Sequence, residues 1–315
     1  MPFYVSGYDT EAIYPYWEMT KGQTYAEAVS YEGTRLRECL DGIRAVAEVH
    51  LRHEAAATFF LVARLVEAAT PELRAILDHP LFDLECHSYT HCGIGSDDAE
   101  SERRELVDSK KLIEDAFGRP VVGMTAPGGH EFGMIGHKLT LEIMAAAGYG
   151  YLRAVGLGPR GTTPAPLTQP FWYTEDGFPD LLEMPTHAWH DNILTGQPGN
   201  THWPPVLPWP HPSTMPTTAA EVYAAYAPGI DYIAARGLQT YTPAFHPWSL
   251  YRVDPAVQQI DLLLSHAARV AQNASCTQVY HHIREHRVSA GPAPPALVRA
   301  HGLGDCGEHS SRSML

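Results

Sequence analysis

The sequence lacks the features that would place the protein outside the cell or in a membrane. Five cysteines, an odd number with no Cys-x-x-Cys pair, do not predict a disulfide framework and favour a reducing compartment. No apolar run approaches the roughly 20 residues that a membrane-spanning helix needs. No basic stretch followed by an apolar one opens the chain, as it would in a secretion signal. We therefore expect a cytoplasmic protein.

Positive charge is also scarce. Lys and Arg number 22 against 36 Asp and Glu, which gives a formal net charge of −14 with histidine neutral. This excess of negative charge disfavours nucleic acid and anionic membrane surfaces as partners. A neutral or cationic small molecule is easier to accommodate.

Two histidines are the most informative pair in the chain. His87 and His91 stand four residues apart, directly after an apolar run that ends at Cys86. On a helical turn, side chains at this spacing share one face and lie about 5–6 Å apart, so both imidazoles can bind one cation. A catalytic zinc usually takes three protein ligands, so a third must come from elsewhere.

The N-terminus offers carboxylates for that purpose. Residues 2–8 are aromatic and β-branched, which predicts a short strand, and Asp9 and Glu11 follow it. One carboxylate of such a pair can bind metal while the other accepts a proton. The plainer alternative is that Asp9 and Glu11 cap a loop and that the two histidines are ordinary surface residues.

Several motifs together resemble the polysaccharide deacetylases, carbohydrate esterase family 4 with the NodB-homology domain. That family carries Asp-Asp near its N-terminus, then His-(Ser/Thr)-x-x-His, Arg-x-Pro and a late Leu-x-x-His. This chain has, in the same order, Asp9-Thr10-Glu11, Thr58-Phe59-Phe60, His87-Ser88-Tyr89-Thr90-His91, Thr125-Ala126-Pro127-Gly128-Gly129 and Phe245-His246-Pro247-Trp248. The order and spacing make the resemblance far more specific than any one motif.

The resemblance implies roles for particular residues. Glu11, His87 and His91 would hold one divalent metal, most simply zinc, with cobalt, nickel or iron as alternatives. Asp9 would be the general base and His246 the general acid, although the roles of Asp9 and Glu11 could be reversed. The motif arginine that pairs with the catalytic Asp is replaced by Thr125. Either another cation such as Arg153 substitutes for it, or the chemistry has drifted.

The implied reaction is hydrolysis of an N-acyl bond, most simply N-acetyl on an amino sugar or a related small intracellular substrate. A bound zinc lowers the pKa of its water toward about 7, and a protonated histidine assists the leaving amine. Alternatives are a cyclic amide or imide hydrolase similar to allantoinase, or an O-acetyl esterase. A catalytically dead carbohydrate-binding protein would be expected to lack ligands or His246.

Alternating strands and helices predict an α/β fold. Strands are expected at 57–62, 81–86, 121–124, 151–155 and 238–245, and helices at 34–53, 65–77, 98–117, 139–147, 218–236 and 255–270. Such repeats favour a parallel barrel with its motifs at the strand ends. The resemblance implies a distorted, incomplete (β/α) barrel of about seven strands. Residues 1–288 would form the catalytic domain and 289–315 a flexible tail.

An insertion at 156–216 is rich in proline and aromatic residues. Aromatic faces stack on sugar rings, although the same residues could form a minor core or a homo-oligomer contact. The predicted substrate-binding residues are Pro127, Gly128, Trp172, Trp189 and Trp248. The pair His187 and His190 is not expected to form a second metal site, because a loop is favoured there and loop histidines usually bond to backbone.

Overall fold

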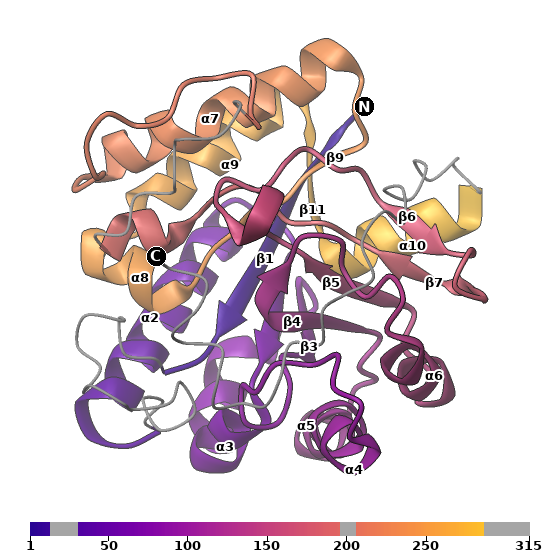
Figure 1. Ribbon diagram of the computed structural model, residues 1–315. Coiled ribbons are helices and arrows are strands. Elements are labelled where there is room, and N and C mark those ends of the chain that lie inside the picture. Colours follow the sequence, from indigo (N-terminus) through magenta and orange to yellow (C-terminus); the bar gives the residue numbers. More distant parts are fainter. Residues whose placement is uncertain (13–30, 196–205, 287–315) are drawn as a thin grey trace.

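The computed structural model describes residues 1–12, 31–195 and 206–286 (Figure 1). The tail expected at 289–315 lies outside this part of the chain. Within it, no helix is long and apolar enough to cross a membrane.

Parallel strands form the centre of the molecule. Six of these strands lie side by side in sequence order. They are β1 (Phe3–Thr10), β2 (Ala57–Leu61), β3 (Phe82–Cys86), β4 (Gly123–His130), β5 (Tyr151–Val155) and β7 (Phe178–Glu183). All of these neighbours pair in parallel. Their C-terminal ends therefore meet at one end of the sheet.

The strands curve into a circuit. After β7 the chain enters β8 (His187–His190), which pairs in parallel with β10 (Pro243–Ala244). The next residue, Phe245, bridges to Tyr8 of β1, and β9 (Thr240–Tyr241) pairs with the start of β1. With β7–β8 and β9–β10 taken as one strand each, the circuit has about seven strands, as predicted.

The barrel is distorted in two places. β3 and β4 share one paired position, Cys86 with Met124, and the register of β4 against β5 shifts between Thr125 and His130. Two further strands extend the sheet: β6 (Phe171–Tyr173) is antiparallel to β7, and β11 (Gln272–Ser275) is parallel to β1.

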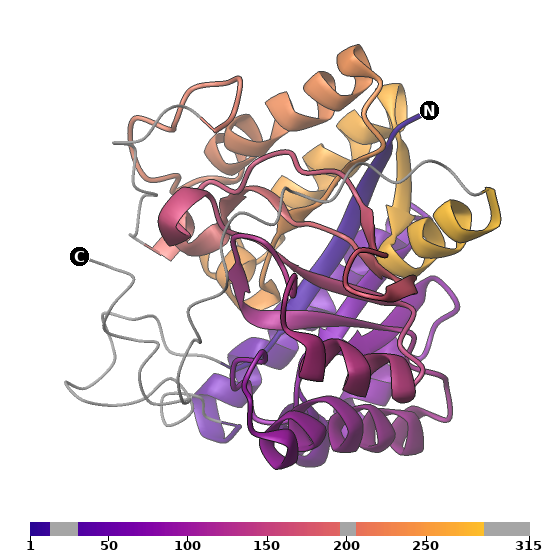
Figure 2. The same ribbon diagram turned by 45° about the vertical axis from the view of Figure 1, so that its right-hand side comes forward.

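Helices surround the strands in both views (Figures 1 and 2). They are α2 (Gly33–Arg52), α3 (Ala63–Leu77), α4 (Ala99–Arg103) and α5 (Ser109–Phe117) joined by a π-helical segment (Arg104–Asp108), α6 (Lys138–Ala146), α7 (Ala219–Arg236), α8 (Pro247–Val253), α9 (Gln258–Val270) and α10 (Cys276–His286). The longer helices bury an apolar face. In α2 that face carries Ile43, Val46 and Val49, at the spacing that predicted this helix.

Helix α7 shows how local sequence sets the boundaries of an element. The Thr218 side chain accepts from the backbone N–H of Glu221, and the Glu221 side chain accepts from the backbone N–H of Thr218. This reciprocal capping box begins the helix, as predicted. Gly237 ends it with φ 63°, a left-handed conformation that glycine adopts without a steric penalty.

Two features near the C-terminus differ from the sequence prediction. The strand expected at 238–245 is two short strands, because Pro243 has no N–H to donate and interrupts the ladder. Helix α8, which begins at Pro247, was not predicted. The last strand of the described residues, β11, leads directly into α10.

The cysteines differ from expectation at one position. Cys39, Cys86 and Cys276 are buried free thiols. Cys92 is disulfide-bonded, which the cysteine pattern did not predict. The disulfide removes the cysteine argument for a reducing compartment.

Candidate metal centre

Three buried side chains converge at the C-terminal ends of β1 and β3. The Nε2 atoms of His87 and His91 are 3.1 Å apart. Glu11 Oε2 lies 3.6 Å from His87 Nε2, and Glu11 Oε1 lies 3.7 Å from His91 Nε2. A tetrahedral zinc about 2.0–2.1 Å from each ligand would separate the ligand atoms by about 3.3 Å. The residues present therefore fit one such ion.

The carboxylate of Glu11 supports the same reading. It is fully buried, and neither oxygen makes a hydrogen bond of good geometry within the described residues. One of its oxygens, Oε1, lies 2.7 Å from His246 Nε2, and a cation held between Glu11, His87 and His91 would add to the compensation of this buried charge. His87 Nδ1 donates to the carbonyl of Thr125 at 2.9 Å, which leaves its Nε2 lone pair facing Glu11.

The segment that carries both histidines is a loop and not the helical turn that their spacing suggested. Ser88 and His91 both have φ 65°, which is incompatible with an α-helix. The loop folds around the buried carboxylate of Glu105. Glu105 accepts from the backbone N–H groups of Tyr89 and Thr90 at 2.8 and 2.9 Å and from the Thr90 hydroxyl at 2.8 Å.

Asp9, the predicted base, is paired with an arginine from another strand. Arg153 Nη1 on β5 donates to Asp9 Oδ1 over 2.8 Å. Arg153 is the register partner of Thr125, so the cation stands one strand away from the position where the family motif has it. Burial acts to raise the pKa of Asp9, but the Arg153 guanidinium and the neighbouring imidazoles of His87, His246 and His190 together lower it. The expectation that Arg153 can replace the motif arginine is confirmed.

His246, the predicted acid, is held by a carboxylate that the sequence reasoning missed. Its Nδ1 lies 2.7 Å from Asp191 Oδ1, and its backbone N–H donates to Asp191 Oδ2 at 2.7 Å. Its Nε2 lies 2.7 Å from Glu11 Oε1. Burial acts to lower the pKa of His246, but Asp191 and Glu11 raise it well above the ordinary value. Asp191 is 55 residues from His246 in the chain, and only the pairing of β8 with β10 reveals the contact.

Three of the predicted substrate-binding positions lie at the strand ends around this site. Trp248 begins α8 with Pro247, and its ring centroid is 6.0 Å from that of His246. Pro127 and Gly128 lie in the irregular end of β4. Gly128 is exposed with φ 82° and has open space where a side chain would stand, as expected for close approach of a ligand.

The structure does not bring the other two predicted aromatics to the metal centre. Trp189 is 2% exposed and packs edge-on against His211, so it is a core residue. Trp172 on β6 packs against a second apolar cluster with Phe3 and Val122, at the strand starts. Their aromatic character predicted sugar binding, but both rings pack against other side chains of the protein.

His187 was expected to bond to backbone, and it does so. His187 lies in β8 and not in the expected loop. Its Nε2 donates to the carbonyl of Thr168 at 2.6 Å, and its Nδ1 accepts from the backbone N–H of Thr242 at 2.9 Å. Both ring nitrogens therefore bond to backbone, as expected for a structural histidine.

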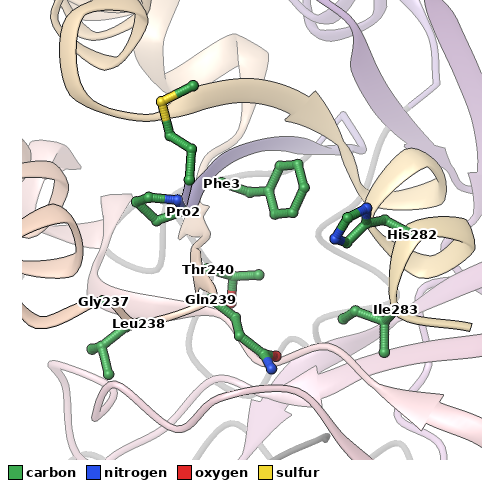
Figure 3. A pocket seen from close by; sticks show the side chains of 9 residues that line it. Pro2, Phe3, Gly237, Leu238, Gln239, Thr240, His282 and Ile283 are labelled. Atoms are coloured by element: carbon green, nitrogen blue, oxygen red, sulfur yellow. The ribbon is translucent and has the colours of Figure 1, made fainter. Parts of the chain in front are cut away.

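A separate cavity lies at the opposite end of the barrel (Figure 3). It has a volume of about 380 Å³ and lies between the start of β1, the chain after α7 and α10. Phe3, Gln239 and His282 are among its lining residues. None of the predicted site residues contributes to it.

Comparison with known proteins supports the motif interpretation. The family model described as polysaccharide deacetylase matches residues 41–152. This span includes His87 and His91 but not Asp9, Glu11 or His246. No curated protein matches the sequence.

Solved structures share the fold at low sequence identity. A putative polysaccharide deacetylase from Mycobacterium smegmatis superposes with TM-score 0.65 and 18% identity, over 94% of this chain and 93% of that one. Puue allantoinase gives 0.61 and 14%, over 90% and 89%. A probable polysaccharide deacetylase from Pseudomonas aeruginosa PAO1 gives 0.61 and 13%, over 91% of each chain. At these identities the likenesses establish the fold alone.

The resemblance to the polysaccharide deacetylase family is therefore confirmed. It supports a hydrolase of the deacetylase class as the coarse function.

Proposed function

We propose that the protein is a metal-dependent hydrolase that removes an N-acyl group, most simply N-acetyl, from an amino sugar or a related small substrate. The observation that carries the proposal is the convergence of Glu11, His87 and His91 between an ion-paired Asp9 and an Asp191-bound His246. Two histidines and one carboxylate favour zinc, with cobalt, nickel and iron as alternatives.

The side chains around the metal divide the proton transfers. The metal, when bound, would supply Lewis-acid chemistry, which activates water and polarises the acyl oxygen. Asp9, kept ionised by Arg153, accepts the proton of the attacking water. His246, oriented by Asp191, donates a proton to the leaving nitrogen, because an amine anion is a poor leaving group near neutral pH.

Burial favours a small substrate. Asp9, His87 and His246 are 7%, 1% and 6% exposed, so a reacting bond must enter a narrow space. A small cyclic amide or imide would fit such a site as well, which keeps an allantoinase-like activity as the second candidate. Hydrolysis of an O-acetyl ester is the third candidate activity, because an alkoxide leaving group depends less on protonation by the general acid. A dead carbohydrate-binding protein is disfavoured, because it would be expected to lack ligands or His246, whereas Glu11 lies within 3.7 Å of His87, His91 and His246.

The test measures bound metal and product release in parallel. Wild type, His87→Ala and Asp9→Asn are incubated with N-acetylated amino sugars and, separately, with cyclic amides. Wild type should bind metal at this site and release acetate. His87→Ala should lose that metal, whereas Asp9→Asn should keep it and lose turnover, because Asp9 is not a ligand.

The outcomes separate the alternatives. Metal binding without acetate release, but with ring opening, would move the substrate class to cyclic amides. Loss of metal in Asp9→Asn would exchange the roles of Asp9 and Glu11. A wild type that binds no metal at His87 would sink the proposal.

A further inference from the structure

A second group of ligand atoms lies beside the first. The Nδ1 atoms of His190 and His246 flank one carboxylate oxygen, Asp191 Oδ1, at 3.3 and 2.7 Å. The other oxygen, Oδ2, accepts from the backbone N–H of His246 and from the Ser249 hydroxyl. Asp191 is therefore fixed with one oxygen directed between two imidazoles.

This arrangement has the composition and spacing of a transition-metal site. Zinc bonds to carboxylate oxygen and imidazole nitrogen over about 2.0–2.2 Å, so its ligand atoms stand about 3.3 Å apart. The ligand atoms of His190, Asp191 and His246 all lie within 4.8 Å of one another. The side chain of His190 is 26% exposed, whereas Asp191 and His246 are buried, so an ion would enter past His190.

We propose that His190, Asp191 and His246 form a second divalent-metal site whose occupation inhibits hydrolysis. The inhibition rests on the proposed function, whereas the binding does not. A metal at this site takes the place of the proton between His246 Nδ1 and Asp191. The imidazole of His246 then cannot be doubly protonated, and the acid of the reaction is lost.

Glu11 connects the two sites. Its Oε1 lies 2.7 Å from His246 Nε2 and 3.7 Å from His91 Nε2. The two sites are therefore neighbours, and a titration with metal should fill the Glu11 site and the His190 site as distinct events. The competing interpretation is a purely hydrogen-bonded cluster, in which both histidines donate to Asp191. That cluster predicts no metal that depends on His190.

The binding test uses the full chain, stripped of metal with a chelator. Equilibrium dialysis against Zn²⁺, followed by elemental analysis, should show one more ion per chain in wild type than in His190→Gln. The visible absorption of Co²⁺, which reports ligand number without any turnover, should rise in an additional step in wild type. Loss of His190 should weaken this second site at least tenfold, since even loss of a partner of a metal ligand costs roughly 10–100-fold in affinity.

Exposed histidines elsewhere need a control. His282 and His286 stand one turn apart on α10 and could bind zinc themselves. The variant His286→Gln should therefore keep the step that His190→Gln loses. Equal zinc content in wild type and His190→Gln at every concentration would overturn the proposal.

Turnover tests the inhibitory role. Acetate release by wild type should rise with the first zinc and fall as the second binds. His190→Gln, compared with its own rate at limiting zinc, should show no such fall, because it lacks one ligand of the second site. An identical fall in both proteins would overturn the inhibition. If no substrate is turned over, the dialysis still decides the second site, and the failure concerns the proposed function alone.

Discussion

Asp9 and Arg153 form an ion pair inside the barrel, although 144 residues separate them in the chain. Arg153 is buried, and its guanidinium lies 4.9 Å from the centre of the Phe60 ring. The pair links the end of β1 to β5, across the strands between them. It places a fixed positive charge beside the residue that must remain ionised to act as a base.

Replacing Arg153 with methionine should damage both stability and turnover. Breaking a buried ion pair leaves the other charge uncompensated, which typically costs about 3–5 kcal/mol. Without the guanidinium, burial raises the pKa of Asp9, and a larger share of the carboxylate is protonated near neutral pH. We expect a lower midpoint of urea unfolding and slower acetate release, with a pH–rate profile whose acidic limb moves to higher pH.

A second substitution distinguishes positioning of charge from general disruption. Thr125 is the register partner of Arg153, so both side chains point to the same face of the sheet. Adding Thr125→Arg to Arg153→Met should restore part of the turnover and return the acidic limb toward its original pH. An Arg153→Met variant with unchanged pH dependence would show that Arg153 does not control Asp9.

The sequence predicted the elements of this site better than their connections. Apolar and β-branched runs located the strands from β1 to β5, which are almost wholly buried, and helical periodicity located the helices between them. The sequence could bring Glu11, His87 and His91 together as candidate ligands because each follows a strand, and parallel strands place their C-terminal ends together. The contact between Asp191 and His246 could not be predicted in this way, because it depends on the pairing of β8 with β10, which no local sequence pattern indicates.

The tryptophans show the opposite error. Trp172 and Trp189 were assigned to substrate from residue type alone, and both pack in apolar surroundings. Large aromatic rings bury much area wherever they stand, so composition cannot separate a core ring from a sugar platform. The segment His87–His91 was predicted as a helical turn because a spacing of four residues suits a helix. It is a loop held by Glu105, and this loop also brings the two imidazoles together.

Stability should depend on pH through His50. This histidine is fully buried on α2, where its Nδ1 donates to the Ala55 carbonyl and its Nε2 accepts from the Tyr8 hydroxyl. Burial lowers its pKa from 6.5 to about 4. The unfolded chain therefore takes up a proton below about pH 6.5 that the folded chain refuses until about pH 4, and stability falls across this window by about 3 kcal/mol.

The variant His50→Gln isolates this contribution. It should be less stable than wild type near neutral pH, since it loses a buried hydrogen-bonded pair, but its stability should fall less between about pH 6.5 and pH 4. Chemical denaturation at a series of pH values measures the difference. His53→Gln, at the end of the same helix and paired with Asp261, serves as the matched control. Parallel curves for wild type and His50→Gln would contradict the prediction.

The loop that carries the metal ligands should depend on Glu105. Its carboxylate binds two successive backbone N–H groups and a hydroxyl of the loop between His87 and His91. Glu105→Gln removes the charge and places an amide N–H₂ among these donors, so the loop must rearrange. Metal affinity should fall by roughly 10–100-fold, the usual cost of losing support for metal ligands. Titration with zinc in a competing chelator measures this change.

Glu102, one turn earlier, provides a matched control. It accepts from the backbone N–H groups of Gly95 and Ser96 and from the Thr140 hydroxyl, in the same pattern but in a part of the chain beyond the two histidines. Both glutamates are buried, so Glu102→Gln and Glu105→Gln should destabilise the fold to a similar extent. Only Glu105→Gln should weaken metal binding. Equal loss of zinc affinity in the two variants would mean that global destabilisation, and not the geometry of the His87 loop, governs the site.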